Sequence, residues 1–250
     1  MNEFSLPITA MILAGGLGIR LRPVVSDRPK PMAPVGESPF LELLLLNLAE
    51  KGITKAVLLT GHMGEVIEDY FRNNPVPGMA VRCVHEHEPL GTGGAVKHAE
   101  AFASDPALLV NGDTFFDADL RRLLEFHERK AADVTISLVW VSDVRRYGSV
   151  SIDSAGMVTG FQEKSAALHG AGWVNAGLTV LSRSVIRALP ANRAFSMEQE
   201  IFPMLAARGR MAGLGQSGAF FDIGTPDSYA KFQQFTQKVF IGKSRREFAT

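Results

Sequence analysis

Apolar runs with strand spacing alternate with helical patterns along the first half of the chain. Short runs of Val, Ile and Leu are typical of buried strands, whereas apolar residues three and four positions apart indicate helices. The pattern predicts strands at residues 8–13, 56–60, 81–85, 107–110 and 134–140. It predicts helices at residues 39–51, 64–72, 93–103 and 119–129. This alternation indicates an α/β fold with a doubly wound, mostly parallel sheet flanked by helices.

The pattern changes after Tyr147. Glycine and aspartate separate two short strands at residues 149–152 and 157–161, which we interpret as a β-hairpin insertion. A buried strand at 172–181 and helices at 183–189, 197–208 and 226–239 are predicted to follow. Because no repeat or long linker interrupts the chain, we predict one domain over residues 1–242, with halves of about 1–118 and 119–242. Residues 243–250 are expected to form a polar, poorly ordered tail.

A glycine-rich turn and a cluster of cations follow the first strand. They are Gly15, Gly16, Gly18, Arg20, Arg22, Arg28 and Lys30. Glycines let backbone N–H groups turn toward an anion, and so many cations suit a polyphosphate better than a single carboxylate. The stretch matches neither the dinucleotide fingerprint nor the P-loop. We therefore predict a triphosphate-binding loop of another type, the alternative being a strand-to-helix turn without a ligand.

Prolines flank one of these cations. Pro29 and Pro31 lie on either side of Lys30, which predicts an extended backbone there. Such a frame would aim the ammonium group into a site, whereas an ordinary proline-rich surface loop is the alternative.

The segment E-P-L-G-T-G-G-A begins a predicted helix at residues 88–95. Two interpretations remain open. Its glycines could let a flat nucleobase approach the backbone, or the segment could be a tight turn in which Thr92 caps the helix.

Two acidic residues follow apolar strands far apart in the sequence. Asp113 comes just after a buried strand, where ligands collect in open α/β sheets, and Asp222 follows F-F near the other end. The two carboxylates could share Mg²⁺, which prefers oxygen ligands. Asn175, inside an apolar strand, is either a satisfied core residue or a ligand of sugar hydroxyl groups.

Composition narrows the function classes. Formal net charge is zero, so we expect no general attraction for nucleic acid or membrane. The single cysteine, Cys83, excludes a disulfide framework, and the six histidines lack metal-ligand spacing. The first residues lack signal-peptide features and the leucine-rich stretch 41–48 is too short to span a bilayer, so a cytoplasmic protein is expected. The sequence leaves the oligomeric state open, and a homo-oligomer is one of the possibilities.

In this order, the motifs resemble those of the sugar-1-phosphate nucleotidylyltransferases. The family signature is similar to L-x-G-G-x-G-x-R-L-x-P followed by P-K-P-M-x-P-V, at residues 13–23 and 29–35. The L-G-T-G loop, G-D motif, E-K pair, N-A-G strand and late acid also match, to about Tyr229. The pattern is most similar to that of D-glycero-D-manno-heptose 1-phosphate guanylyltransferases. Ile19 stands where many members have Thr, which removes one hydroxyl contact to phosphate.

The resemblance implies a Rossmann-like fold with a small sugar-binding β insertion. It implies Mg²⁺-dependent transfer of a nucleotidyl group from a nucleoside triphosphate to a sugar 1-phosphate, with release of pyrophosphate. Glu86 precedes the L-G-T loop where relatives that use UTP often have Gln, and a carboxylate suits the adjacent N–H donors of guanine. GTP and a heptose 1-phosphate are therefore preferred. One alternative is the same chemistry with mannose, glucose or N-acetylmuramate 1-phosphate and either GTP or UTP. An alternative of another class is a non-catalytic nucleotide-sugar sensor.

The resemblance also implies a set of site residues. The residues implied to bind the nucleotide are Leu13, Ala14, Gly15, Gly16, Gly18, Arg20, Lys30, Glu86, Gly91 and Thr92. The residues implied to bind the sugar are Gly112, Gly148, Glu163, Lys164 and Asn175. The implied catalytic residues are Arg20, Lys30, Asp113 and Lys164, and the implied metal ligands are Asp113 and Asp222.

Overall fold

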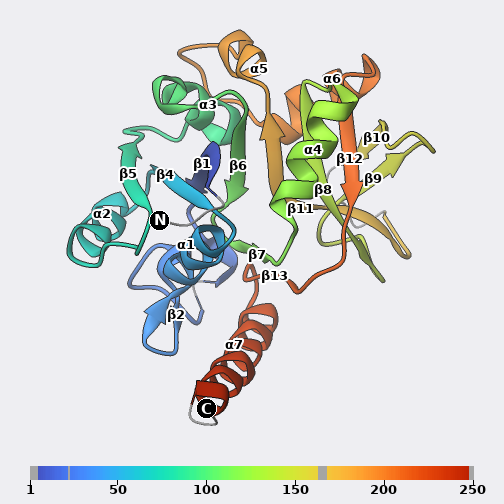
Figure 1. Ribbon diagram of the computed structural model, residues 1–250. Coiled ribbons are helices and arrows are strands. Elements are labelled where there is room, and N and C mark those ends of the chain that lie inside the picture. Colours follow the sequence, from blue (N-terminus) through green and yellow to red (C-terminus); the bar gives the residue numbers. More distant parts are fainter. Residues whose placement is uncertain (1–4, 22, 163–167, 248–250) are drawn as a thin grey trace.

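A single mixed sheet forms the centre of the molecule. The computed structural model describes residues 5–21, 23–162 and 168–247. Within them, nine strands form this sheet in the order β10-β9-β11-β6-β1-β4-β5, with β8 paired to β11 and β12 paired to β8 (Figure 1). The strands are β1 (Leu6–Ala14), β4 (Ile53–Thr60), β5 (Ala80–His85), β6 (Ala107–Asn111), β8 (Val134–Val141), β9 (Ser149–Ile152), β10 (Val158–Gln162), β11 (Gly172–Leu181) and β12 (Met211–Gly215).

The first half of the chain supplies the parallel part of the sheet. β1 pairs in parallel with β4 and β6, and β4 pairs in parallel with β5. β11 is antiparallel to both β6 and β8, which joins the two predicted halves in one sheet. The predicted α/β fold with a mixed sheet is therefore confirmed, although among the described residues four strand pairings are parallel and four antiparallel. β12, with the sequence M-A-G-L-G, was not predicted.

Helices cover both faces of the sheet. On one face lie α1 (Phe40–Glu50), α2 (Gly64–Asn73) and α4 (Leu120–Lys130). Helix α7 (Pro226–Glu247) continues this apolar layer beyond the sheet, where Phe232 packs against Phe40 and Phe221. On the other face lie α3 (Gly91–His98), α5 (Arg183–Ala188), the π-helical turn η4 (Met197–Ile201) and α6 (Phe202–Ala207). Side chains alternate between the faces along each strand. In β4, for example, Ala56 and Leu58 pack on the first face, whereas Val57 and Leu59 pack on the second.

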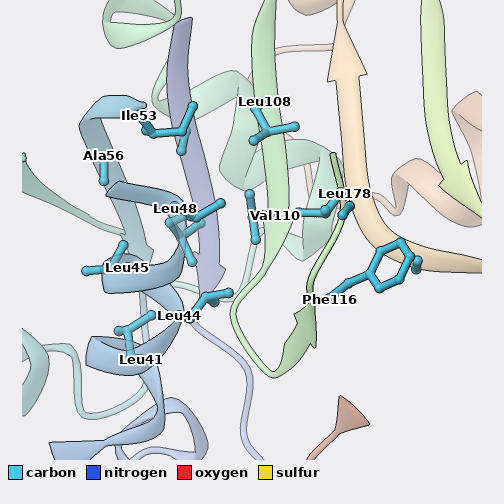
Figure 2. Close-up of a cluster of buried hydrophobic side chains, with 14 of the residues drawn as sticks. Leu41, Leu44, Leu45, Leu48, Ile53, Ala56, Leu108, Val110, Phe116 and Leu178 are labelled. Atoms are coloured by element: carbon cyan, nitrogen blue, oxygen red, sulfur yellow. The ribbon is translucent and has the colours of Figure 1, made fainter. Parts of the chain in front are cut away.

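Helix α1 shows how the apolar pattern becomes a core. Leu41, Leu44, Leu45 and Leu48 have helical spacing, and all four side chains are buried beside Ile53 of β4 (Figure 2). Full burial of one such side chain contributes about 1.5–3 kcal/mol. This stripe anchors α1 against the parallel strands, whose carboxyl ends carry the candidate site.

Several short elements were not predicted. A two-stranded ribbon pairs β7 (Thr114–Phe116) with β13 (Phe220–Asp222), and another pairs β2 (Pro34–Val35) with β3 (Ser38–Pro39). The 3-10 turns are η1 (Ile19–Leu21), η2 (Lys30–Met32) and η3 (Glu100–Phe102).

Helix α7 begins as predicted but continues to Glu247 (Figure 1). Residues 243–247, expected in a tail, are therefore helical, and residues 248–250 lie outside the described part. In the part of the chain that the structure describes, no helix has the length and apolar character needed to cross a membrane.

Candidate active site

A cavity of about 1070 Å³ lies at the sheet edge where the parallel strands end. Most predicted site residues line it: Leu13, Gly15, Gly16, Gly18, Arg20, Lys30, Glu86, Gly91, Thr92, Gly112, Asp113, Asn175 and Asp222. Ala14 is instead buried in the core, and Gly148 follows the lining residue Tyr147 without lining the cavity itself. Arg22, Glu163 and Lys164 lie outside the described residues.

The glycine loop packs directly on the segment that carries Lys30. Gly18 has a φ of +60°, and a Cβ atom there would lie 2.8 Å from the Cβ of Lys30. Pro29 is extended, but Lys30 itself begins the 3-10 turn η2, closed by a hydrogen bond from Met32 N–H to Pro29 O. The predicted extended backbone at Lys30 was therefore wrong. The Lys30 side chain is nevertheless held in place, with only 10% of it exposed.

The ribbon of β7 and β13 brings the two acidic residues together. Asp222 is opposite Thr114, the residue after Asp113, and Ile223 N–H donates to Asp113 O at 3.0 Å. Asp113 follows β6, so this short ribbon holds the end of β13 against the carboxyl edge of the main sheet. The predicted meeting of the two carboxylates is thus accounted for by pairing that the sequence pattern did not reveal.

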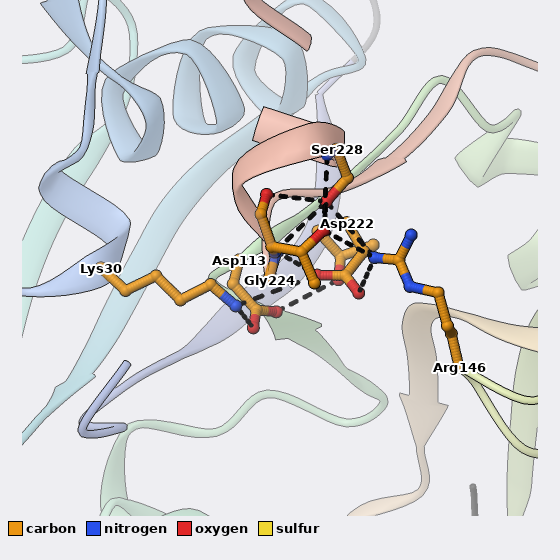
Figure 3. Close-up of polar contacts among 8 residues, drawn as sticks. Lys30, Asp113, Arg146, Asp222, Gly224 and Ser228 are labelled. Carbon is orange, nitrogen blue, oxygen red and sulfur yellow. Dashed lines mark hydrogen bonds and ion pairs between the residues drawn. The ribbon is translucent and has the colours of Figure 1, made fainter. Parts of the chain in front are cut away.

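Lys30 lies between the two carboxylates. Its Nζ is 2.5 Å from Asp113 Oδ2 and 3.9 Å from Asp222 Oδ1 (Figure 3). Thr114 Oγ1 donates to Asp113 Oδ1 at 3.1 Å, and Gly224 N–H donates to Asp222 Oδ1 at 2.6 Å. Burial opposes ionisation of Asp113, but the Lys30 ammonium holds its pKa below the usual value. Asp113 is therefore a carboxylate at neutral pH.

Arg146 is a site residue that sequence reasoning missed. Its Nη2 lies 3.7 Å from Asp222 Oδ2 and donates to Thr225 Oγ1 and Ser228 Oγ, each at 3.3 Å (Figure 3). It lines the cavity and is partly exposed. Its place two residues before Gly148, in the R-R-Y-G segment, was the signal available in the sequence.

The carboxylate pair fits a hard divalent cation. Asp113 and Asp222 supply oxygen ligands, and the ammonium of Lys30 already stands as a cation between them. Among the described residues, no group of three His, Cys, Asp or Glu side chains could hold a metal by itself. Such a site would suit a cation that takes one or two carboxylates together with substrate phosphates and water.

Glu86 follows β5 and lines the same cavity. Its backbone N–H donates to Thr60 O at 2.8 Å, and its Oε2 accepts from Leu90 N–H at 3.2 Å. A Cβ atom at Gly15 or Gly61 would lie 2.6 or 2.7 Å from Glu86 Oε1, so a side chain at either position would displace the carboxylate. Burial raises the pKa of Glu86, although the Leu90 N–H opposes this. Gly61 was not predicted as a site residue.

At two glycines of the L-G-T-G-G loop, the place of a side chain is taken by another part of the protein. A Cβ atom at Gly91 would lie 2.5 Å from Phe195 O, and one at Gly93 would lie 2.1 Å from the Phe195 ring. Gly93 N–H donates to Phe195 O at 3.0 Å, and Phe195 N–H donates to Leu90 O at 2.9 Å. Both positions therefore need glycine to admit the segment around Phe195, and the approach of a nucleobase to this loop stays a prediction.

Thr92 bridges the two halves of the chain. Its Oγ1 donates to Glu198 Oε2 at 2.6 Å and accepts from Met197 N–H at 2.8 Å. The helix begins after Leu90, without a side-chain cap, so the alternative in which Thr92 caps α3 was wrong. Glu198, on the π-helical turn η4, also lines the cavity and was missed.

Asn175 lies at an irregularity of β11. The pairing of β11 with β8 changes register between Asn175 and Thr179, and Gly177 has a φ of +79°. Asn175 Oδ1 accepts from Gly177 N–H at 3.0 Å, and the residue lines the cavity. The amide oxygen therefore stabilises the bend while the residue lines the cavity, and binding of sugar hydroxyl groups by Asn175 stays a prediction.

Comparison with known proteins identifies the class. The family described as nucleotidyl transferase matches residues 9–239, and the chain belongs to this family of enzymes. This confirms the resemblance drawn from the motifs and the predicted fold class.

Individual relatives narrow the comparison. A D-glycero-alpha-D-manno-heptose 1-phosphate guanylyltransferase of Aneurinibacillus thermoaerophilus is 38% identical, over 91% of this chain and 98% of its own. A mannose-1-phosphate guanylyltransferase of Mycobacterium tuberculosis is also 38% identical, over 90% of this chain but 63% of its own. The crystal structure of HddC from Yersinia pseudotuberculosis has a TM-score of 0.83 at 34% identity, covering 92% of this chain and 99% of HddC. HddC has also been solved in complex with GMP-PN.

Proposed function

We propose that the protein transfers a guanylyl group from GTP to D-glycero-D-manno-heptose 1-phosphate, giving the GDP-sugar and pyrophosphate. One observation carries the proposal: the glycine loop, Arg20 and Lys30 share one cavity with the paired carboxylates of Asp113 and Asp222. Polyphosphate transfer needs this combination of cations and metal-binding acids. The heptose guanylyltransferase that matches over nearly its whole length supports the choice of substrates.

The proposed chemistry is an in-line displacement. A phosphate oxygen of the sugar phosphate attacks the α-phosphorus of GTP, the new P–O bond forms, and the bond to pyrophosphate breaks. The attacking oxygen is already anionic, so no general base is needed. Backbone N–H groups of Gly15, Gly16 and Gly18 bind the triphosphate, while Arg20 and Lys30 neutralise the negative charge on the phosphates. Lys164 positions the sugar phosphate in this proposal.

A divalent cation, which we propose to be Mg²⁺, completes the site. It would be held by Asp113 and Asp222 and would draw negative charge from the α-phosphate when bound. A site of two carboxylates with room for phosphate oxygens and water suits Mg²⁺. Water and substrate phosphates usually supply most of the ligands of this ion.

Glu86 is the proposed recognition group for guanine. One of its oxygens already accepts from Leu90 N–H, and the residue lines the cavity beyond the glycine loop. Guanine presents two adjacent donors, N1–H and N2–H₂, whereas uracil presents one donor between acceptors. A carboxylate therefore favours guanine.

The direct test is pyrophosphate release by purified protein with pairs of substrates. GTP and UTP are each offered with heptose, mannose, glucose or N-acetylmuramate 1-phosphate, with and without Mg²⁺. We expect the largest kcat/KM for GTP with the heptose phosphate. Mannose 1-phosphate is the second candidate, because the mycobacterial relative is equally identical to this chain. Nucleotide binding without pyrophosphate release from any pair would instead favour a nucleotide-sugar sensor.

A pair of variants tests the carboxylates. Asp113→Asn should lower turnover by orders of magnitude, because removing the charge weakens a metal site worth several kcal/mol in the transition state. Asp117→Asn is the matched control, since Asp117 is exposed and pairs with Lys51 at 2.6 Å outside the cavity. Normal turnover in the first variant would show that the metal site is misassigned.

A further inference from the structure

The carboxylate pair is surrounded by cations. Lys30 Nζ contacts Asp113 and approaches Asp222, while Arg146 Nη2 lies 3.7 Å from Asp222 (Figure 3). Arg20 is also near, because a Cβ atom on Gly224 would lie 3.2 Å from its Nη2. Counting only described residues, two negative and three positive side chains meet here. The cluster thus carries an excess of positive charge before any substrate binds.

Lys30 stands between the two carboxylates that we propose as metal ligands. Its ammonium is 2.5 Å from Asp113 Oδ2, so a divalent cation bound to this oxygen would lie close to the ammonium and be repelled by it until the ammonium moves away. Only 10% of the Lys30 side chain and 13% of that of Asp222 are exposed, which limits screening of the repulsion by water. A metal ion alone would therefore meet an occupied and repulsive site.

A triphosphate would remove this obstacle. Gly18 packs on the Cβ of Lys30, so phosphates bound by the glycine loop would lie within reach of the same side chain. Lysine has a flexible four-carbon stem, and its ammonium can turn from carboxylate to phosphate while its backbone stays in η2. This movement of the side chain would free Asp113 at the moment when phosphate oxygens become available as further metal ligands.

We propose that Lys30 is an internal counter-ion that closes the metal site in the free protein, so that the divalent cation binds only together with the nucleoside triphosphate. This inference rests on the proposed function, because it takes Asp113 and Asp222 as the metal ligands. Lys30 thereby couples the two binding events, and by thermodynamic reciprocity each ligand tightens the binding of the other.

The test measures binding of Mn²⁺, as a substitute for Mg²⁺, by electron paramagnetic resonance without any turnover. Lys30→Met removes the charge and keeps an unbranched stem. In the absence of nucleotide, we expect K30M to bind Mn²⁺ roughly tenfold or more tightly than the wild type. Lys51→Met, which removes a lysine outside the cavity, should leave binding unchanged, and adding Asp113→Asn to K30M should abolish the gain.

A second arm measures the coupling itself. A non-hydrolysable GTP analogue should tighten Mn²⁺ binding by a smaller factor in K30M than in the wild type, since association of Mn²⁺ with the free analogue is common to both. Thermal melting checks that each variant is folded, and K30Q gives the same comparison if K30M does not fold. Equal affinity of the wild type and K30M for Mn²⁺ without nucleotide would overturn the role of Lys30 alone. Absence of Mn²⁺ binding in every folded variant, with or without the analogue, would overturn the proposed metal site as well.

Discussion

Replacing Glu86 by Gln should reduce the preference for GTP over UTP. Oε2 of Glu86 is held by Leu90 N–H at 3.2 Å, and Oε1 lies against Gly15 and Gly61. A glutamine at this position has one oxygen and one NH₂ group. If its oxygen faces Leu90 N–H, its NH₂ group faces the guanine donors, and if it is reversed, the NH₂ group faces Leu90 N–H. Either orientation leaves one N–H group without an acceptor.

The magnitude follows from the bond that is lost. A hydrogen bond to a charged group contributes about 1.5–3 kcal/mol, and an unsatisfied buried donor costs about 1–3 kcal/mol. A loss of about 2–3 kcal/mol corresponds to a fall of roughly 30- to 150-fold in kcat/KM for GTP. UTP lacks the paired donors and should be little affected. The ratio of the two kcat/KM values should therefore fall by the same factor.

The assay measures pyrophosphate release with GTP and UTP at a fixed concentration of the sugar phosphate. Glu88→Gln is the matched control, because Glu88 lies two residues further along the chain and also lines the cavity. Since burial raises the pKa of Glu86, the wild-type preference for GTP should also weaken as pH falls and the carboxylate is protonated. An unchanged GTP-to-UTP ratio in Glu86→Gln would refute the assignment of this residue.

Two further predictions concern stability. Gly93→Ala should lower the free energy of unfolding by about 1–3 kcal/mol in urea titrations, because its Cβ would lie 2.1 Å from the Phe195 ring. Gly16→Ala, with no atom within 4 Å of its Cβ, should stay within about 0.5 kcal/mol of the wild type, and an equal loss in both would contradict the packing argument. The buried His127, whose Nδ1 lies 2.8 Å from Thr135 Oγ1, has its pKa lowered from 6.5 by burial, so the unfolded chain takes up this proton first. The stability contributed by the neutral ring should be complete above about pH 6.5 and lost as pH falls through the lower pKa of the folded state. His127→Gln should abolish this pH dependence of the free energy of unfolding, measured by urea titrations at pH 7.5 and 5.5.

The parallel strands and their helices were predictable because each is specified by its own local pattern. β4, for instance, contains the apolar run A-V-L-L at residues 56–59, and the stripe of leucines in α1 has clear helical spacing. The glycine loop, Lys30 and the two acids were found in the same way, from short segments whose chemistry is local. The meeting of the glycine loop and Asp113 at one sheet edge follows from the parallel arrangement of β1 and β6, whereas Asp222 is brought there by the β7–β13 ribbon.

The remaining features depend on contacts between distant segments. β7 and β13 each contain three residues, too few for a pattern, and they are specified only by pairing with each other. The glycines at 91 and 93 have a sequence signature, but the segment that requires them, around Phe195, lies about a hundred residues away. Arg146 likewise acquires a role only because the end of β13 is folded against it.

The direct pairing of β11 with β6 limits how substrate preference can change. Leu178 lies opposite Val110, so the strand that carries Asn175 is joined by backbone hydrogen bonds to the strand that precedes Asp113. The opposing walls of the cavity are thus continuous through the sheet, and their separation is set when the chain folds. Redesign for a larger or smaller sugar should therefore exchange side chains around the rim and keep the strand lengths as they are.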